Sequence, residues 1–127
     1  MSQRWIVDAM NVIGSRPDGW WKDRRGAMAR LVEIVERWAR AQDNRVTVVF
    51  EHPISPPIAS AVVEIAHAPS AAANSADDEI VRLVEAYDEP QHITVVTSDG
   101  ALAERVRSAG VTVYPSSAFR NLIEPPH

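Results

Sequence analysis

The stretch Arg4-Trp-Ile-Val-Asp8 is a short apolar run that ends in a carboxylate. Comparable apolar runs return at residues 46–50, 62–66, 93–97 and 111–114, and each predicts a strand. Continuous rather than alternating apolar runs are typical of strands that are covered on both faces, as in parallel sheets.

Helical periodicity separates these strands. Apolar residues return at spacings of three and four from Ala27, and again after residue 75 and from Ala101 to Gly110. Asp23 is a candidate cap for the first of these helices, and residues 116–123 allow a last short one. Loops are expected at 15–21 and 69–76, and a short helix after Pro53, Pro56 and Pro57 is only weakly signalled. Alternating strands and helices predict an α/β fold with a central parallel sheet of about five strands.

Length and composition indicate one soluble domain over residues 1–127, with 46% hydrophobic and 24% charged residues. Cysteine is absent, so disulfides, zinc-thiolate sites and thiol nucleophiles are excluded. No apolar run is long enough to span a membrane, and a strand follows the N-terminus at once, so we expect a cytoplasmic protein. The net charge of −4 counts against a nucleic-acid binder, although arginines crowd residues 16–30.

Carboxylates gather at the predicted ends of the strands. Asp8 ends the first strand, Glu51 the second, and Asp99 follows the fourth, while Asp77 and Asp78 open the helix after the third. The carboxyl ends of parallel strands meet at one edge of the sheet, where such folds place their sites. Clustered carboxylates repel one another unless a cation lies between them, and oxygen ligands favour Mg²⁺ or Mn²⁺. A metal held there can activate water and cleave a phosphodiester.

Each of these residues also has a purely structural interpretation. Asp8 suits a cap for the following turn, Asp77 and Asp78 suit the first turn of a helix, and Asp99 before a glycine suits a turn. Asn11 is equally suited to forming a turn and to holding a carboxylate or a phosphate oxygen. The convergence of the acids on one edge favours function for the set.

Four motifs, in order, resemble the YacP-like NYN domain of the PIN-like nuclease superfamily. They are Asp8-Ala-Met-Asn11-Val-Ile, Val48-Val-Phe-Glu51, Ser75-Ala-Asp77-Asp78-Glu-Ile80 and Val95-Val-Thr-Ser-Asp99. The resemblance covers nearly the whole chain. It implies a three-layer α/β/α, Rossmann-like fold with sheet order 3-2-1-4-5, and metal-dependent endoribonuclease activity.

The resemblance also implies residue roles. Asp8, Asp77 and Asp99 would be catalytic metal ligands, with Asn11 in support and Mg²⁺ or Mn²⁺ as the cofactor. The second strand of such proteins often ends in aspartate, and here it ends in Glu51, so the part of Glu51 in the site stays open. Asp78 stands where the family often has a small hydroxyl residue, and its part is open in the same way.

Residues after the first strand's loop are candidates for holding the RNA. Aromatic rings stack on unpaired bases and cations contact phosphate, which suits single-stranded RNA. The alternative is that a tryptophan packs and the arginines only solvate a turn. Arg120, near the predicted fifth strand, is a further candidate. The candidate RNA contacts are thus Trp21, Lys22, Arg24, Arg25 and Arg120, with Trp20 beside them.

RNA is the expected partner, with no membrane and no nucleotide cofactor; oligomeric state and any presenting ribosome are left open. The rival function is an RNA-binding or scaffold module that kept the fold without the chemistry. A phosphoacceptor receiver domain is excluded, because it needs an acid pair after strand one and a lysine after strand five, where this chain has Pro115 and Ser116.

Overall fold

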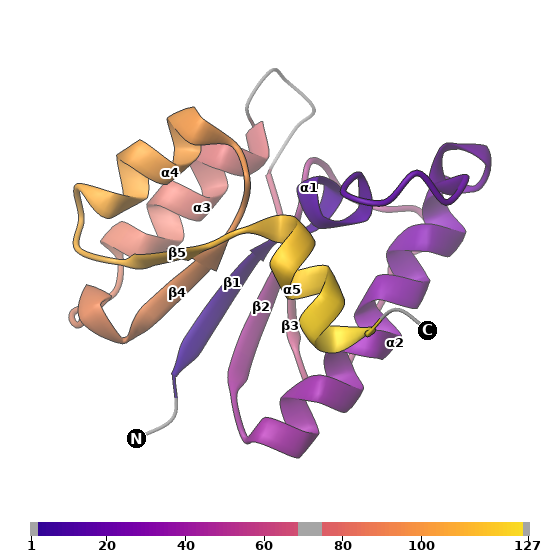
Figure 1. The fold of residues 1–127 in the computed structure, drawn as a ribbon, viewed down its shortest axis with the longest axis horizontal. Helices are drawn as coiled ribbons and strands as arrows, with labels where there is room; N and C mark the ends of the chain where they lie inside the picture. The colour runs from indigo at the N-terminus through magenta and orange to yellow at the C-terminus, as the bar shows by residue number, and fades with distance from the viewer. Residues whose placement is uncertain (1–2, 69–74, 126–127) are drawn as a thin grey trace.

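The sheet of this protein contains β1 (Arg4–Asp8), β2 (Arg45–Phe50), β3 (Glu64–His67), β4 (Ile93–Val96) and β5 (Thr112–Tyr114) (Figure 1). The computed structural model describes residues 3–68 and 75–125. Every pair of neighbouring strands is parallel. Their order is β3-β2-β1-β4-β5, which confirms the order expected from the family resemblance.

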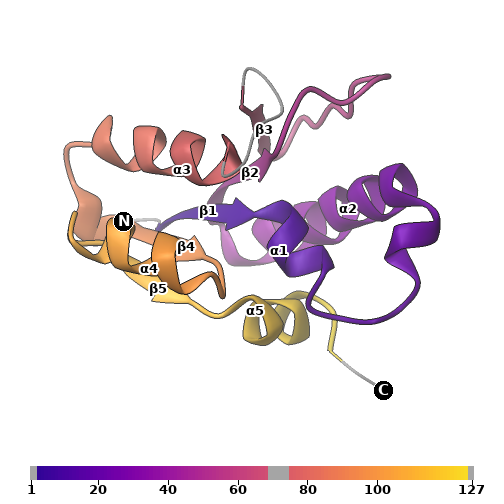
Figure 2. The same ribbon diagram turned by 90° about the horizontal axis from the view of Figure 1, so that it is seen from above.

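Helices cover both faces of the sheet, as a three-layer α/β/α fold requires. On one face lie α1 (Ala9–Ile13), α2 (Arg24–Gln42) and α5 (Ser116–Ile123), packed on Val7, Val48 and neighbouring strand residues. On the other lie α3 (Ser75–Glu85) and α4 (Gly100–Arg107), packed on Ile6 and Val95 (Figures 1 and 2). Alternate residues of each central strand therefore enter different cores, which is why these strands are apolar without interruption.

The strand register brings three strand ends to one edge of the sheet. Asp8 pairs with Val49 of β2, and Val7 pairs with Val96 of β4, so Asp8 stands level with the residue after β4. That residue, Thr97, and Asp8 are both buried. Parallel topology therefore places the last residue of β1 beside the residue that follows β4 and within two positions of Glu51, which follows β2.

Several local elements differ from the prediction. Helix α1 was not expected, and five residues are too few to form a stable helix alone; it is held by Ala9, Val12 and Ile13, which are buried. Strand β3 runs over Glu64–His67 rather than 62–66. The described loop 51–63 contains no helix, in keeping with prolines that lack an N–H donor. Most of the predicted loop 69–76 lies outside the described residues.

The ends of the helices follow the expected capping chemistry. The Asp23 carboxylate accepts from Gly26 N at 3.0 Å and caps α2, which confirms Asp23 as the cap that the sequence predicted. Helix α4 ends at Arg107, before the predicted end at Gly110; Gly110 has a φ of +97° and donates its N–H to Arg107 O at 2.9 Å, a left-handed conformation typical of the turn that closes a helix. Two short 3₁₀ helices, η1 (Trp20–Lys22) and η2 (Pro90–His92), were not predicted.

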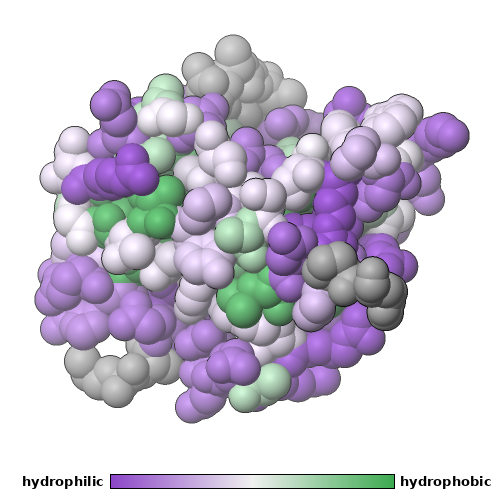
Figure 3. Space-filling view, in the orientation of Figure 1, coloured by the Kyte–Doolittle hydropathy of each residue, from purple (hydrophilic) through white to green (hydrophobic). Residues whose placement is uncertain are grey.

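The surface is mostly hydrophilic on the face shown in Figure 3, with apolar side chains in small separate patches. Among the described residues, no helix is both long and apolar enough to cross a membrane.

Candidate active site

Asp8 lies at the centre of the acidic edge. Its side chain is buried, with the residue only 6% exposed, and it makes no capping bond to the helix that follows. Burial raises the pKa of Asp8 from 3.8 to about 6, against a hydrogen bond from Thr97 that lowers it. The charges of Asp77, Asp99 and Glu51 are smaller contributions to the same rise in the pKa of Asp8. The capping interpretation of Asp8 is therefore wrong, and its carboxylate faces other acids.

Thr97 links Asp8 to Asp99. Its hydroxyl donates to Asp8 Oδ2 at 2.9 Å and accepts from the Asp99 backbone N–H at 3.1 Å. Thr97 is 1% exposed, so this pair of bonds is shielded from water. The two acids are thereby held in a defined relation although they lie 91 positions apart in the chain.

Asp99 serves as the N-cap of α4 through one of its carboxylate oxygens. Its Oδ1 accepts from Leu102 N at 3.0 Å, which satisfies one of the unpaired N–H groups at the helix start. Asp99 also raises the pKa of both Asp8 and Asp77, so its charge lies within reach of both. Asp99 therefore both caps α4 and contributes negative charge to the acidic edge.

Asp77 and Asp78 are adjacent in α3 but point to different partners. The pKa of Asp77 is raised by burial and by Asp99, with Arg105 acting in the opposite direction. Asp78 is exposed, and its Oδ1 accepts from Arg105 Nη1 at 3.1 Å across the α3–α4 contact. Glu51 follows β2 and its charge raises the pKa of both Asp8 and Asp77. The structure thus brings Asp8, Asp77, Asp99 and Glu51 together, and directs Asp78 to Arg105.

Asn11, on α1, joins the loop after β4 to the start of α5. Its Oδ1 accepts from Ser98 N at 2.8 Å and from Ser116 Oγ at 2.5 Å. Ser98 Oγ in turn accepts from Ser116 N at 2.9 Å. Because both bonds use the oxygen, the amide group of Asn11 is oriented and its NH₂ is directed away from the two serines.

Three residues of this network were not identified from the sequence as site residues: Thr97, Ser98 and Ser116. Thr97 and Ser98 immediately precede Asp99, so hydroxyl residues between a strand and an acid were the available signal. Ser116 offered none, because its partner is 105 residues away.

The two neighbouring tryptophans divide between core and surface. Trp20 packs against the core under α2, while Trp21 is 51% exposed, and their rings make an edge contact at 5.9 Å. The Arg24 guanidinium lies 5.2 Å from the Trp20 ring centre. Lys22, Arg24 and Arg25 are exposed at the start of α2. The exposed Trp21 ring and three cationic side chains therefore lie in the segment that the sequence predicted to contact RNA.

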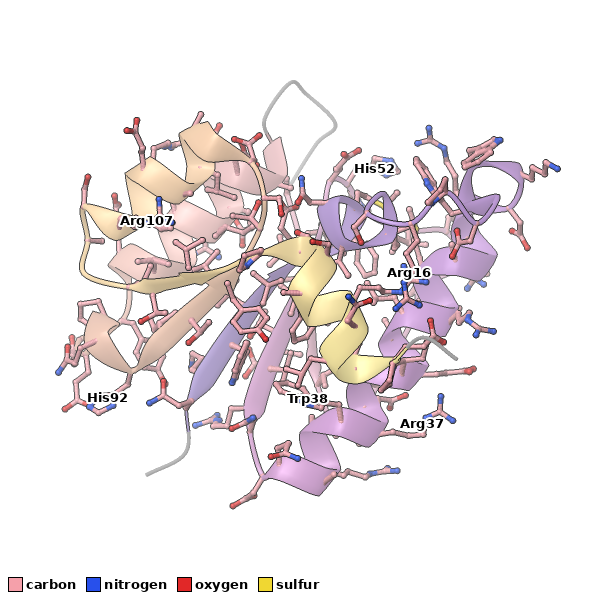
Figure 4. The ribbon with its side chains drawn as sticks, viewed as in Figure 1. Arg16, Arg37, Trp38, His52, His92 and Arg107 are labelled. Atoms are coloured by element: carbon pink, nitrogen blue, oxygen red, sulfur yellow. The ribbon has the colours of Figure 1, made fainter. Side chains whose placement is uncertain are left out.

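Arg120 is not part of this exposed surface, although it lines a pocket together with Trp20 and Asp23. It is buried in α5, and its Nη2 donates to Asp18 Oδ2 at 3.1 Å and to Glu124 Oε1 at 3.4 Å. Arg16 and Arg30 also bind Glu124, and Figure 4 shows Arg16 between α5 and α2. In the structure, Arg120 ties the loop after α1 to the C-terminal helix.

The side chains of the acidic edge form a candidate donor set for a metal ion. Within residues 3–68 and 75–125, no group of three or more His, Asp or Glu side chains is arranged to hold a metal ion. The four acids that act on one another nevertheless offer only hard oxygen donors, the type that Mg²⁺ and Mn²⁺ prefer. Magnesium commonly takes only one or two protein carboxylates and fills its shell with water and substrate phosphate. The donor chemistry therefore fits such an ion.

Comparisons with known proteins agree on the fold. The family model described as YacP-like NYN domain matches residues 5–126. No curated protein matches the sequence significantly. The chain is similar to a tryptophan-to-leucine mutant of Rae1 (YacP) from Bacillus subtilis, with a TM-score of 0.81 and 23% identity, covering 98% of this chain and 76% of that one. It is also similar to Rae1 (YacP) without that mutation, with a TM-score of 0.76 and 23% identity over 94% of this chain and 72% of that one.

Proposed function

The chain belongs to the family of YacP-like NYN domains, and we propose that it is a metal-dependent endoribonuclease that hydrolyses single-stranded RNA. One observation carries the proposal: the buried Asp8 carboxylate is surrounded by the charges of three other acids. Such an arrangement destabilises a folded chain unless a cation offsets the repulsion. Membership of a nuclease family supplies the reaction for which that cation would be needed.

In this proposal, Asp8, Asp77 and Asp99 hold Mg²⁺ or Mn²⁺ with Glu51 at the outer edge. Asp78 is left out, because it is paired with Arg105. The bound ion would polarise the scissile phosphate and lower the pKa of an attacking water. Since Oδ1 of Asp99 caps α4, its Oδ2 is the oxygen that would serve as a ligand.

The chain's own residues orient the reactants. Thr97 holds the Asp8 carboxylate by donating to Oδ2, so its ionised form keeps one fixed direction. Asn11, whose oxygen is engaged by two donors, directs its NH₂ group outward as a donor for a phosphate oxygen. Trp21, Lys22, Arg24 and Arg25 would hold the strand by stacking and by contact with phosphate.

The decisive experiment is cleavage of a labelled single-stranded RNA with Mg²⁺ or Mn²⁺ and with excess chelator. We expect cleavage only with metal, and none in Asp8→Asn or Asp99→Asn variants whose fold is intact by circular dichroism. Asp88→Asn is the matched control, because Asp88 is exposed before η2, at the opposite end of the sheet. Full activity in chelator, or in the Asp8→Asn variant, would overturn the mechanism.

The rival function, an RNA-binding module without chemistry, is favoured by the lack of a ready three-acid metal arrangement among the described residues. Calorimetric titration with Mn²⁺ separates the two functions. The nuclease predicts binding heat for the wild type and none for Asp77→Asn, whereas a module without a metal site predicts no heat from either protein.

A further inference from the structure

A small pocket adjoins the acidic edge on the side of α2. It has a volume of about 230 Å³ and is lined by both apolar and charged side chains. Its wall includes Glu51, whose charge raises the pKa of Asp8, and Met10, the neighbour of Asn11. The pocket is therefore directly adjacent to the acids of the proposed nuclease site.

The floor of this pocket is apolar and closely packed. Phe50 and Met28 are 1% and 8% exposed, and Ile54 packs against the same core from the loop after β2. Methionine side chains are polarisable and adapt to a flat ring laid against them. The volume is below the roughly 300–1,000 Å³ typical of pockets for drug-sized ligands, so the space suits a single ring system.

The rim of the pocket is polar and carries positive charge. Arg24 and Arg25 from α2 and His52 from the loop after β2 contribute to it. The Arg25 guanidinium donates to Pro56 O through Nε at 3.3 Å and Nη2 at 2.9 Å, so it spans from α2 to the opposite loop. This bridge fixes the width of the pocket, because it ties one wall to the other.

His52 presents hydrogen-bonding groups at the same rim. Its Nδ1 lies 2.9 Å from Pro53 O, and since a carbonyl only accepts, this contact is a hydrogen bond when Nδ1 carries the proton. Nε2 then remains as the nitrogen that can accept from a ligand. Figure 4 shows His52 beside α1, at the end of the sheet opposite His92.

The pocket offers three surfaces to one nucleotide: an apolar floor, a cationic rim and, next to the pocket, the acidic edge proposed to hold the metal. The floor matches the face of a base, the arginines match a phosphate, and the acids match the place of cleavage. An apolar side chain of similar size would leave both arginines without an anionic partner, whereas a nucleotide brings its own phosphate, which favours nucleic acid as the occupant.

We propose that this pocket, formed by Met10, Met28, Phe50 and Ile54 under the Arg24–Arg25 rim, binds one unpaired base next to the scissile phosphate. This rests on the proposed nuclease function, and adds that the enzyme has a base preference at one position beside the cut. Arg25 acts as a positioning residue, since it sets the pocket width through Pro56.

The test fills the mouth of the pocket with Ser55→Trp, an exposed position in the pocket lining outside the acidic cluster. Arg37→Ala is the matched control, an exposed arginine of α2 that lies far from His52 in Figure 4. Binding of short single-stranded RNA is measured by fluorescence anisotropy in excess chelator, so that no cleavage occurs. Cleavage of an RNA with a randomised segment is then sequenced in Mn²⁺.

We expect Ser55→Trp to weaken RNA binding about tenfold, within the range that one stacked base contributes, while Arg37→Ala changes it less than about twofold. The wild type should prefer certain bases at one position beside the cut, and Ser55→Trp should lose that preference while its Mn²⁺ binding is unchanged. Arg25→Ala should weaken the preference as well.

The outcomes separate this inference from the proposed function. If the wild type binds RNA without cleaving it and Ser55→Trp weakens binding, the pocket stands as a base-binding site, while the nuclease function and the base preference beside the cut are both refuted. If the wild type cleaves, but Ser55→Trp keeps the same affinity and the same base preference, the nuclease stands and the pocket is refuted. A wild type that neither binds nor cleaves RNA overturns both.

Discussion

Replacing Asp8 by asparagine should stabilise the metal-free protein while removing its cleavage activity. Because folding raises the pKa of Asp8, the folded chain favours the protonated carboxyl. The stability linked to this group is fully present below the unfolded pKa of 3.8 and is lost as the pH rises through about 6. A shift of that size destabilises the folded, ionised state by about 3 kcal/mol at neutral pH.

Asparagine cannot ionise, and it still offers an oxygen to the Thr97 hydroxyl. The free energy of unfolding of Asp8→Asn should therefore exceed that of the wild type by up to about 3 kcal/mol near pH 8, but by less than about 1 kcal/mol near pH 4. In a chain of this length, the larger figure corresponds to a rise of about 10 °C in Tm.

The measurement is urea or thermal unfolding of both proteins in chelator near each pH. Asp88→Asn again serves as the control and should show no pH-dependent gain, because that carboxylate is exposed. Addition of Mn²⁺ should then raise the Tm of the wild type and leave that of Asp8→Asn unchanged, since bound metal stabilises only the state that binds it. A variant no more stable than the wild type near pH 8, or equally stabilised at both pH values, would refute the claim that Asp8 is held at an electrostatic penalty.

Three further predictions follow from the contacts of the site. Asp99→Asn keeps a good N-cap, so it should leave the free energy of unfolding nearly unchanged while abolishing cleavage and the heat of Mn²⁺ binding. Asp99→Ala should in addition lose about 1 kcal/mol of stability in urea unfolding. Equal stability of the two variants would contradict the capping role. Thr97→Val removes the bond that lowers the pKa of Asp8, so the acidic limb of the cleavage rate should move to higher pH, and an unmoved limb in the pH–rate profile would exclude this role. Trp21→Ala should weaken RNA affinity about tenfold in anisotropy titrations without lowering Tm. Arg120→Met should lower Tm by several degrees without changing RNA affinity, because Arg120 is buried and paired with Asp18. The reverse pattern would show that RNA contacts α5 rather than η1.

Local pattern predicted most of the fold because strands and helices impose their periods on neighbouring residues. Strand β1 begins and ends where the apolar run Arg4-Trp-Ile-Val-Asp8 does, and α5 spans the predicted residues 116–123. The weakest prediction was β3, whose partly exposed residues give a weaker apolar signal than the buried central strands. Helix α1 was missed because its five residues are helical through tertiary packing rather than intrinsic preference.

Some features of the candidate site could also be predicted from the sequence, and others could not. That Asp8 and Asp99 share an edge follows from the sequence, because parallel strands align their carboxyl ends whatever lies between them. Which partner each side chain takes does not follow, since it depends on contacts between residues distant in the chain. Trp20 and Trp21 have the same chemistry, yet Trp20 is partly buried against the core and Trp21 is exposed to solvent.

The sequence by itself therefore determined the order of the strands and of the longer helices, the parallel sheet and the edge at which the acids meet. Only the tertiary structure decided that Thr97 joins Asp8 to Asp99, that Asp78 turns to Arg105 and that Arg120 is buried against Asp18. The physical reason is that backbone periodicity is a local property of the chain. The hydrogen bonds and ion pairs of a site are instead selected by which side chains the completed packing brings within about 3 Å of one another.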